Sequence, residues 1–132
     1  MFHAMVDPGA TTSHRQIAMW CHLSGAIVAG LALISGGAVT GLAFVAPLII
    51  WQVNKAASPF VDDHGREAVN FQLSCLFYTI AVSVFPDESG DALQRTVALG
   101  SLAGTAFAGF AAHNGRFFRY PMCLRLLKGA PA

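Results

Sequence analysis

The stretch Ser58–Gln72, which reads SPFVDDHGREAVNFQ, is a strongly polar segment between two long apolar blocks, and it decides how the rest of the chain is interpreted. Ser58 followed by Pro59 is typical of a helix start, because Ser caps the first turn and Pro suits its first position. Apolar and charged residues then fall on opposite faces. We therefore predict a short interfacial helix here, with a bend at Gly65, which leads into a membrane helix beginning near Ala68.

The composition places the chain among membrane proteins. Of its 132 residues, 55% are hydrophobic and 11% are charged, and the mean hydropathy is +0.54. A soluble domain carries about 25% charged residues. The net charge of +1 provides no basic field for nucleic acid. We therefore expect the lipid bilayer, and no nucleic acid, as a partner.

The first apolar block, residues 17–53, contains no Asp, Glu, Lys or Arg. One membrane span needs about 20 residues, so this block is long enough for two. Glycines 36 and 37 favour a break, which predicts helices at about 17–35 and 38–53. A re-entrant hairpin is the alternative.

Two further spans follow the polar stretch, at about 68–85 and 92–112. The predicted fold is an all-α integral membrane protein, a four-helix transmembrane bundle with a short cytoplasmic interfacial helix before the third span. The membrane domain covers 17–112, between an N-terminal tail (1–16) and a C-terminal tail (113–132).

The basic residues orient this bundle. Four spans place seven of them on one side: Arg15, Lys55, Arg66, Arg116, Arg119, Arg125 and Lys128. Only Arg95 lies on the other side. Because basic residues favour the cytoplasm, we predict a multi-pass protein of the bacterial inner (cytoplasmic) membrane with both termini cytoplasmic.

Small residues recur along the predicted helices at spacings that let helix backbones approach closely. They are Gly100, Gly104 and Ala108 in the fourth helix, and Gly25 and Gly30 in the first. We expect them to pack helices within the bundle, and dimerisation is the alternative.

The C-terminal tail carries charge that complements the central stretch. Arg116 and Arg119 would face Asp62, Asp63 and Glu67 on the same side of the membrane, so we predict at least one Arg–carboxylate pair between them. Residues 122–128 would form a short strand or a surface helix.

Two motifs carry a family resemblance. Pro59-Phe60-Val61-Asp62 with His64–Gln72, and Asn114-Gly115 with Phe118-Arg119-Tyr120-Pro121, resemble the signature of a bacterial family of small membrane proteins. That family is related to the Tic-twenty-type component of the chloroplast import translocon. The resemblance implies a four-helix membrane protein and, by analogy, a role in protein transport. It assigns the docking motif to Pro59, Phe60, Asp62, Asp63, His64, Gly65, Arg66, Glu67, Asn70, Phe71, Gln72, Asn114, Gly115, Arg119, Tyr120 and Pro121.

Three sharper chemical hypotheses have weaker support. Asp62, Asp63 and His64 with Glu67 offer metal-ligand types, but consecutive helical residues cannot all face one ion. His22 and His113 could hold a haem, although nothing else in the sequence indicates one. A third set, His22, Asn70, Gln72 and Ser74, could line a polar pathway, and hydrogen bonding between helices is the alternative.

The chain lacks the motifs of hydrolases, nucleotide-binding proteins, zinc proteases and thiol redox proteins. We therefore predict a non-enzyme without cofactor or metal, an accessory or assembly subunit that binds other membrane-protein subunits or itself. A translocation or permeation component is the first alternative, and a haem or metal-binding membrane subunit is the second.

Overall fold

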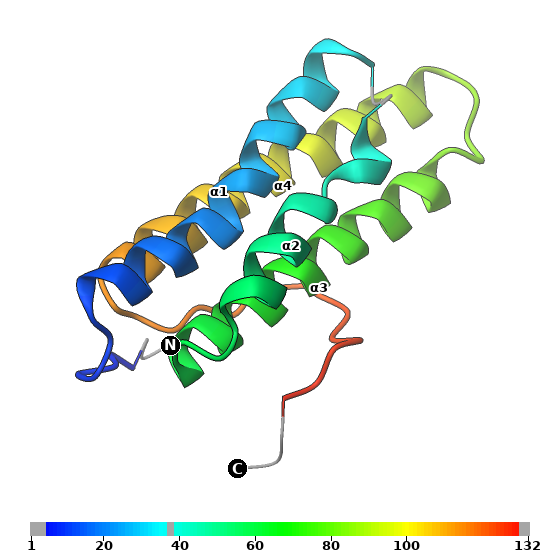
Figure 1. Ribbon diagram of the computed structural model, residues 1–132. Coiled ribbons are helices and arrows are strands. Elements are labelled where there is room, and N and C mark those ends of the chain that lie inside the picture. The colour runs from blue at the N-terminus through cyan, green and yellow to red at the C-terminus, as the bar shows by residue number, and fades with distance from the viewer. Residues whose placement is uncertain (1–4, 37–38, 130–132) are drawn as a thin grey trace.

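The computed structural model describes residues 5–36 and 39–129, and this part of the chain forms a bundle of four α-helices (Figure 1). Successive helices run in opposite directions, and α1 and α3 each contact the other three. The expected all-helical fold is confirmed. The elements are α1 (Thr12–Ile34), the 3-10 helix η1 (Thr40–Leu42), α2 (Val45–Asn54), α3 (Pro59–Val82) and α4 (Glu88–His113).

Helix α1 begins five residues before the predicted start at residue 17. Thr11 caps it, because the Thr11 hydroxyl accepts the backbone N–H of His14 at 3.2 Å. The His14 ring nitrogen Nδ1 accepts the Thr11 N–H in return, at 3.4 Å. This reciprocal cap places the first turn inside the segment that the sequence assigned to a tail.

The second helix is much shorter than predicted. Its ten residues span about 15 Å, half the thickness of a bilayer core. Pro47 lies in its first turn, where the missing N–H breaks no helical bond. The predicted start at residue 38 lies outside the described residues.

Helix α3 is continuous from Pro59, so the prediction of a separate interfacial helix with a bend at Gly65 is wrong. Gly65 serves helix packing instead. A Cβ there would lie 2.2 Å from Cδ1 of Trp51, so the glycine lets the indole of α2 lie against the α3 backbone. The indole Nε1–H also donates to Asp62 Oδ1 at 2.8 Å, which fixes the ring in place.

Helix α4 begins at Glu88 rather than at the predicted residue 92. Asp87 precedes it, and its Oδ1 accepts the backbone N–H groups of Ser89 at 3.0 Å and of Gly90 at 3.4 Å. Hydrogen bonds, chiefly from the Ser89 hydroxyl, hold the pKa of Asp87 below its usual value.

Much of the bundle's surface is apolar. Helices α1 and α4 are long and apolar enough to cross a membrane, and only about a third of each apolar window is buried. Large side chains project outward along them, for example Ile27 (58% exposed), Phe107 (69%) and Phe110 (71%). This surface, which we call the apolar band, indicates membrane association.

The small residues that were predicted to pack the helices differ in how closely other helices approach them. A Cβ on Gly25 would lie 2.2 Å from Nε2 of Gln72, so Gly25 makes room for a side chain of α3, and Ala108 is fully buried. Gly30 and Gly100 have open space where a Cβ would be. Close helix packing therefore uses only some of the glycines that were expected to provide it.

The chain after α4, Arg116–Leu127, crosses back over α3 as an extended segment, which we call the strap (Figure 1). The predicted short strand or surface helix is absent from residues 122–128. Gly115 turns the chain with a φ of +70°, which favours glycine.

The first described residues are joined to the start of the strap. Val6 forms an antiparallel bridge with Arg116, and the Asp7 N–H donates to the Gly115 carbonyl at 2.9 Å. Both ends of the described chain therefore lie at the same end of the bundle, which we call the charged end (Figure 1).

Candidate functional site

Polar side chains along one face of α3 hold the backbone of the strap. Asn70 accepts the Leu127 N–H at 2.8 Å and donates to the Leu127 carbonyl at 2.9 Å. Ser74 Oγ accepts the Leu124 N–H at 2.8 Å. Asn70 and Ser74, which the sequence suggested for a polar pathway, therefore act as hydrogen-bond partners for the backbone of the strap at Leu124 and Leu127.

Two ion pairs fasten the strap at the charged end. The guanidinium of Arg119 donates to both carboxylate oxygens of Asp63, at 2.6 and 2.7 Å, which confirms the predicted Arg–carboxylate pair. Asp63 raises the pKa of Arg119 by this contact. Glu67, only 4% exposed, accepts Arg125 Nη2 at 2.9 Å and the Tyr120 N–H at 3.0 Å. These pairs join the strap to the first turns of α3.

A buried hydrogen-bond chain connects α1, α3 and the strap. The Tyr120 hydroxyl lies 2.8 Å from His22 Nδ1, and His22 Nε2 lies 2.8 Å from His64 Nδ1. The last link joins His64 Nε2 to the Arg116 carbonyl at 3.1 Å. We call these four groups the histidine relay.

One arrangement of protons satisfies the whole histidine relay with neutral rings. A carbonyl only accepts, so His64 Nε2–H donates to Arg116 and leaves His64 Nδ1 as an acceptor. His22 must then donate from Nε2 and accept at Nδ1 from the Tyr120 hydroxyl. Each buried polar group in the relay thus has a partner, which favours a single arrangement of the three elements.

The surroundings of the relay keep His64 neutral. Its pKa is lowered to about 4, chiefly by burial; Arg119 also lowers the pKa, whereas Asp63 and the hydrogen bond to the Arg116 carbonyl act to raise it. His64 belongs to the charged end, beside Asp63 and outside the apolar band. Burial also raises the pKa of Tyr120 well above its usual value, so its hydroxyl stays protonated and can donate.

The haem hypothesis does not fit this arrangement. Both ring nitrogens of His22 lie within hydrogen-bonding distance of Tyr120 and His64, so neither is available to a haem iron without breaking the relay. His113 is exposed at the end of α4. Among residues 5–36 and 39–129, no group of three His, Cys, Asp or Glu side chains is placed to hold a metal ion.

Aromatic side chains pack the strap against α3. The Tyr120 ring stacks on Phe71 with centroids 3.7 Å apart and planes 5° from parallel. Phe60 is fully buried, and the centroid of its ring lies 5.2 Å from that of Phe117 and 4.5 Å from that of His64. The motif residues that resembled a family signature therefore build the contact between α3 and the strap.

The remaining motif residues lie at helix ends or in a turn of the strap. Pro59 opens α3, Asn114 caps the end of α4 and Pro121 begins an exposed turn of the strap. A Cβ on Gly104 would lie 3.1 Å from the Phe71 ring and 3.3 Å from that of Tyr120, so this glycine makes room for the stacked pair.

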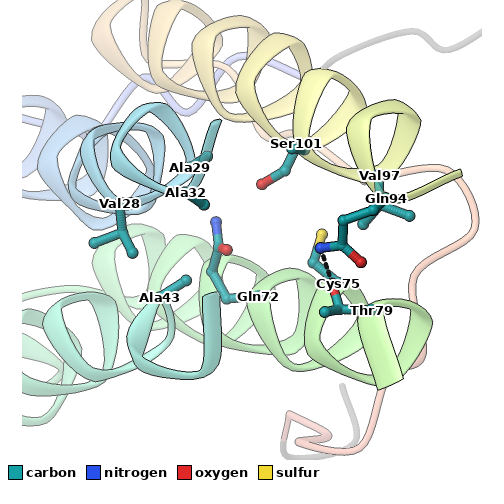
Figure 2. Close-up of a pocket in the computed structure, with 11 residues that line it drawn as sticks. Val28, Ala29, Ala32, Ala43, Gln72, Cys75, Thr79, Gln94, Val97 and Ser101 are labelled. Atoms are coloured by element: carbon teal, nitrogen blue, oxygen red, sulfur yellow. Dashed lines mark hydrogen bonds between the residues drawn. The ribbon is translucent and has the colours of Figure 1, made fainter. Parts of the chain in front are cut away.

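Gln72 lies apart from the strap, in a small cavity between α1, α3 and α4 (Figure 2). Gln72 is 2% exposed, and its Oε1 has no hydrogen-bond partner among the described residues. The cavity measures about 20 Å³, which is room for about one water. Figure 2 shows Ser101 of α4 on the same cavity.

Several residues of the site were not predicted from the sequence. Trp51 is only 8% exposed and packs on Gly65, a contact that the sequence did not predict. Arg125 was predicted only to lie on the cytoplasmic side, with no partner; its one signal was a positive charge that could reach the acidic residues of α3. The backbone groups of Leu124 and Leu127 carry no side-chain signal at all.

The comparisons with known proteins concern the whole bundle. The model of the magnetosome magnetite crystal formation protein family matches residues 13–127. No curated protein and no solved structure matches the chain.

The family match overturns the resemblance to the Tic-twenty-like family. That resemblance depended on the polar residues of α3 and the strap, which here bind one another. A contact of this kind stabilises a fold and does not identify one family, and the analogy with protein transport falls with the resemblance. Because the match covers most of its 132 residues, this chain belongs to the magnetosome magnetite crystal formation protein family.

Proposed function

We propose that this protein is a non-catalytic accessory subunit of the magnetosome membrane, which supports magnetite crystal formation by docking other membrane proteins at its charged end. The family description supplies the process and the compartment. The observation that carries the docking role is the strap. Side chains of α3 hold it in one extended conformation, so the charged end presents a preformed surface to a partner.

The proposal places the bundle across the membrane with both described ends on the cytoplasmic side. The apolar band of α1 and α4 supports this placement. The distribution of charge supports it too, because the basic residues, apart from Arg95, belong to the charged end, and positive charge favours the cytoplasm.

The hydrogen bonds of the site support a non-catalytic role. A serine nucleophile needs a base within hydrogen-bond reach. The Ser74 hydroxyl instead donates to the Asn70 carbonyl at 2.8 Å. The imidazoles of His22 and His64 are hydrogen-bonded to each other and to groups that fix the strap. These groups serve the fold, and a partner would bind the surface that they hold in place.

The test uses magnetite-forming cells that lack this gene. They would receive the wild-type gene, the double variant Asp63→Asn with Glu67→Gln, or the control Arg95→Gln at the opposite end of the bundle. Electron microscopy would measure crystal size and number, and immunoblots of membranes would measure the amount of protein.

We expect wild type and Arg95→Gln to restore normal crystals and the double variant to fail at equal protein level. Full restoration by the double variant would refute docking at the charged end. Unchanged crystals in cells without the gene would refute the accessory role itself.

A further inference from the structure

A charged cleft of about 420 Å³ lies between α3 and the strap at the charged end. Four cations and two carboxylates line it: Arg66, Arg119, Arg125, Lys128, Asp63 and Glu67. We propose that this cleft binds a phosphate group at the membrane surface.

The two carboxylates of the cleft are already neutralised. Both oxygens of Asp63 accept hydrogen bonds from Arg119. Glu67 accepts Arg125 and a backbone N–H, and it is almost fully buried. Each carboxylate would repel an anion in the cleft, but the guanidinium paired with it, Arg119 for Asp63 and Arg125 for Glu67, offsets this repulsion.

Two further cations remain available to a ligand. Arg66 contacts Asp62, outside the cleft, through Nη2 at 3.0 Å, and most of its donors are not used by that contact. Lys128 forms no ion pair with any residue in the described part of the chain. The cleft thus offers a forked guanidinium and an exposed ammonium, a combination suited to phosphate oxygens.

The position of Arg66 is restricted by the backbone that follows the strap. A Cβ on Gly129 would lie 3.0 Å from the Arg66 guanidinium carbon, so the guanidinium lies directly against this glycine. Arg66 is also only 20% exposed. A cation held in this way loses little conformational freedom when it binds an anion.

The phosphate could belong to a lipid headgroup or to a free phosphate ion. Basic pockets at the cytoplasmic side of membrane helices suit anionic lipid headgroups. The lipid source rests on the membrane placement in the proposed function, whereas binding of free phosphate does not. If wild type binds no phosphate but the crystals still depend on Asp63 and Glu67, this inference fails and the proposed function stands. If wild type binds phosphate but cells without the gene form normal crystals, the proposed function fails and this inference stands.

The experiment uses the full chain in nanodiscs. One set of discs contains only phosphatidylcholine, and inorganic phosphate is titrated by calorimetry. A second set contains phosphatidylglycerol as well, and native mass spectrometry counts the anionic lipids retained. The test variant is Arg66→Gln with Lys128→Gln, and the matched control is Lys55→Gln with Arg95→Gln, which removes two cations outside the cleft.

We expect the test variant to bind about tenfold more weakly than wild type in at least one arm, while the control binds as wild type does. Loss confined to the phosphatidylglycerol arm identifies a lipid headgroup, and loss in the inorganic phosphate arm identifies a free ion. Equal binding by test and control variants, or no binding in either arm, would overturn the proposal. Trypsin protection of the strap arginines checks that the test variant keeps its fold.

Discussion

The imidazoles of His22 and His64 meet at 2.8 Å across a separation of 42 residues in the sequence, and they join α1 to α3 in the buried interior of the charged end. Each ring also reaches the strap, His22 through the Tyr120 hydroxyl and His64 through the Arg116 carbonyl. The two side chains therefore connect three parts of the chain that the backbone alone does not hold together.

Replacing His22 should release the strap. His22→Leu leaves the Tyr120 hydroxyl and a ring nitrogen of His64 without buried partners, and each unsatisfied group costs about 1–3 kcal/mol. We expect trypsin to cut after Arg116 and Arg119 at least about tenfold faster than in wild type. The control is His113→Leu, because that side chain is exposed. Equal cutting of the two variants would show that the relay does not hold the strap.

Acid should weaken the same contact. His64 has a pKa of about 4 in the fold and about 6.5 when unfolded, so the unfolded chain binds more protons between these values. Stability is therefore full above about pH 6.5 and falls as the pH drops toward 4, by on the order of 3 kcal/mol. Strap protection against an acid-active protease, measured across this range, checks the prediction. A flat profile between pH 6.5 and 4 would contradict it.

Two glycines should respond oppositely to alanine. Gly65→Ala forces a methyl group against the Trp51 ring, which Asp62 holds in place, and overpacking of this kind costs about 1–3 kcal/mol. Gly30→Ala meets open space and should stabilise α1 by about 1 kcal/mol or less. Thermal unfolding in one detergent compares the pair. A lower melting temperature for Gly30→Ala than for Gly65→Ala would contradict this account of the packing.

If the apolar band lies in the bilayer, an Asp substitution should have different effects on membrane attachment at two equally exposed apolar residues. Phe107, in the apolar band, is 69% exposed, and Leu126, on the strap, is 68% exposed. An Asp in a bilayer core costs about 2.5–3.5 kcal/mol or more, whereas an Asp at the charged end meets water. We expect Phe107→Asp, and not Leu126→Asp, to reduce the carbonate-resistant membrane fraction. Equal fractions would argue against membrane-spanning α4.

The order and approximate positions of the helices were predictable from the sequence because helix signals are local, but their ends were less so. Ser58 does cap α3, and its hydroxyl accepts the Val61 N–H at 3.1 Å. The Arg119–Asp63 pair was also predictable, since complementary charges were expected on one side of the membrane. The start of α1 was missed because its capping partner is His14, where the usual motif has Glu or Gln.

The strap was less predictable because its hydrogen bonds have no periodic signature. An extended chain bound by the Asn70 amide uses backbone groups, and every residue type has those. The role of Gly65 was misjudged for a related reason: the packing of Trp51 depends on how α2 lies against α3, and no local pattern encodes that.

The order of the elements along the chain has a consequence for biosynthesis. The polar face of α3 is translated before the strap that covers it, with all of α4 in between. During synthesis Ser74 therefore stays without its strap partner until Leu124 has emerged from the ribosome, and Asn70 until Leu127 has emerged. The charged end is completed last, so the proposed docking partner would recognise only chains that have been synthesised as far as the strap.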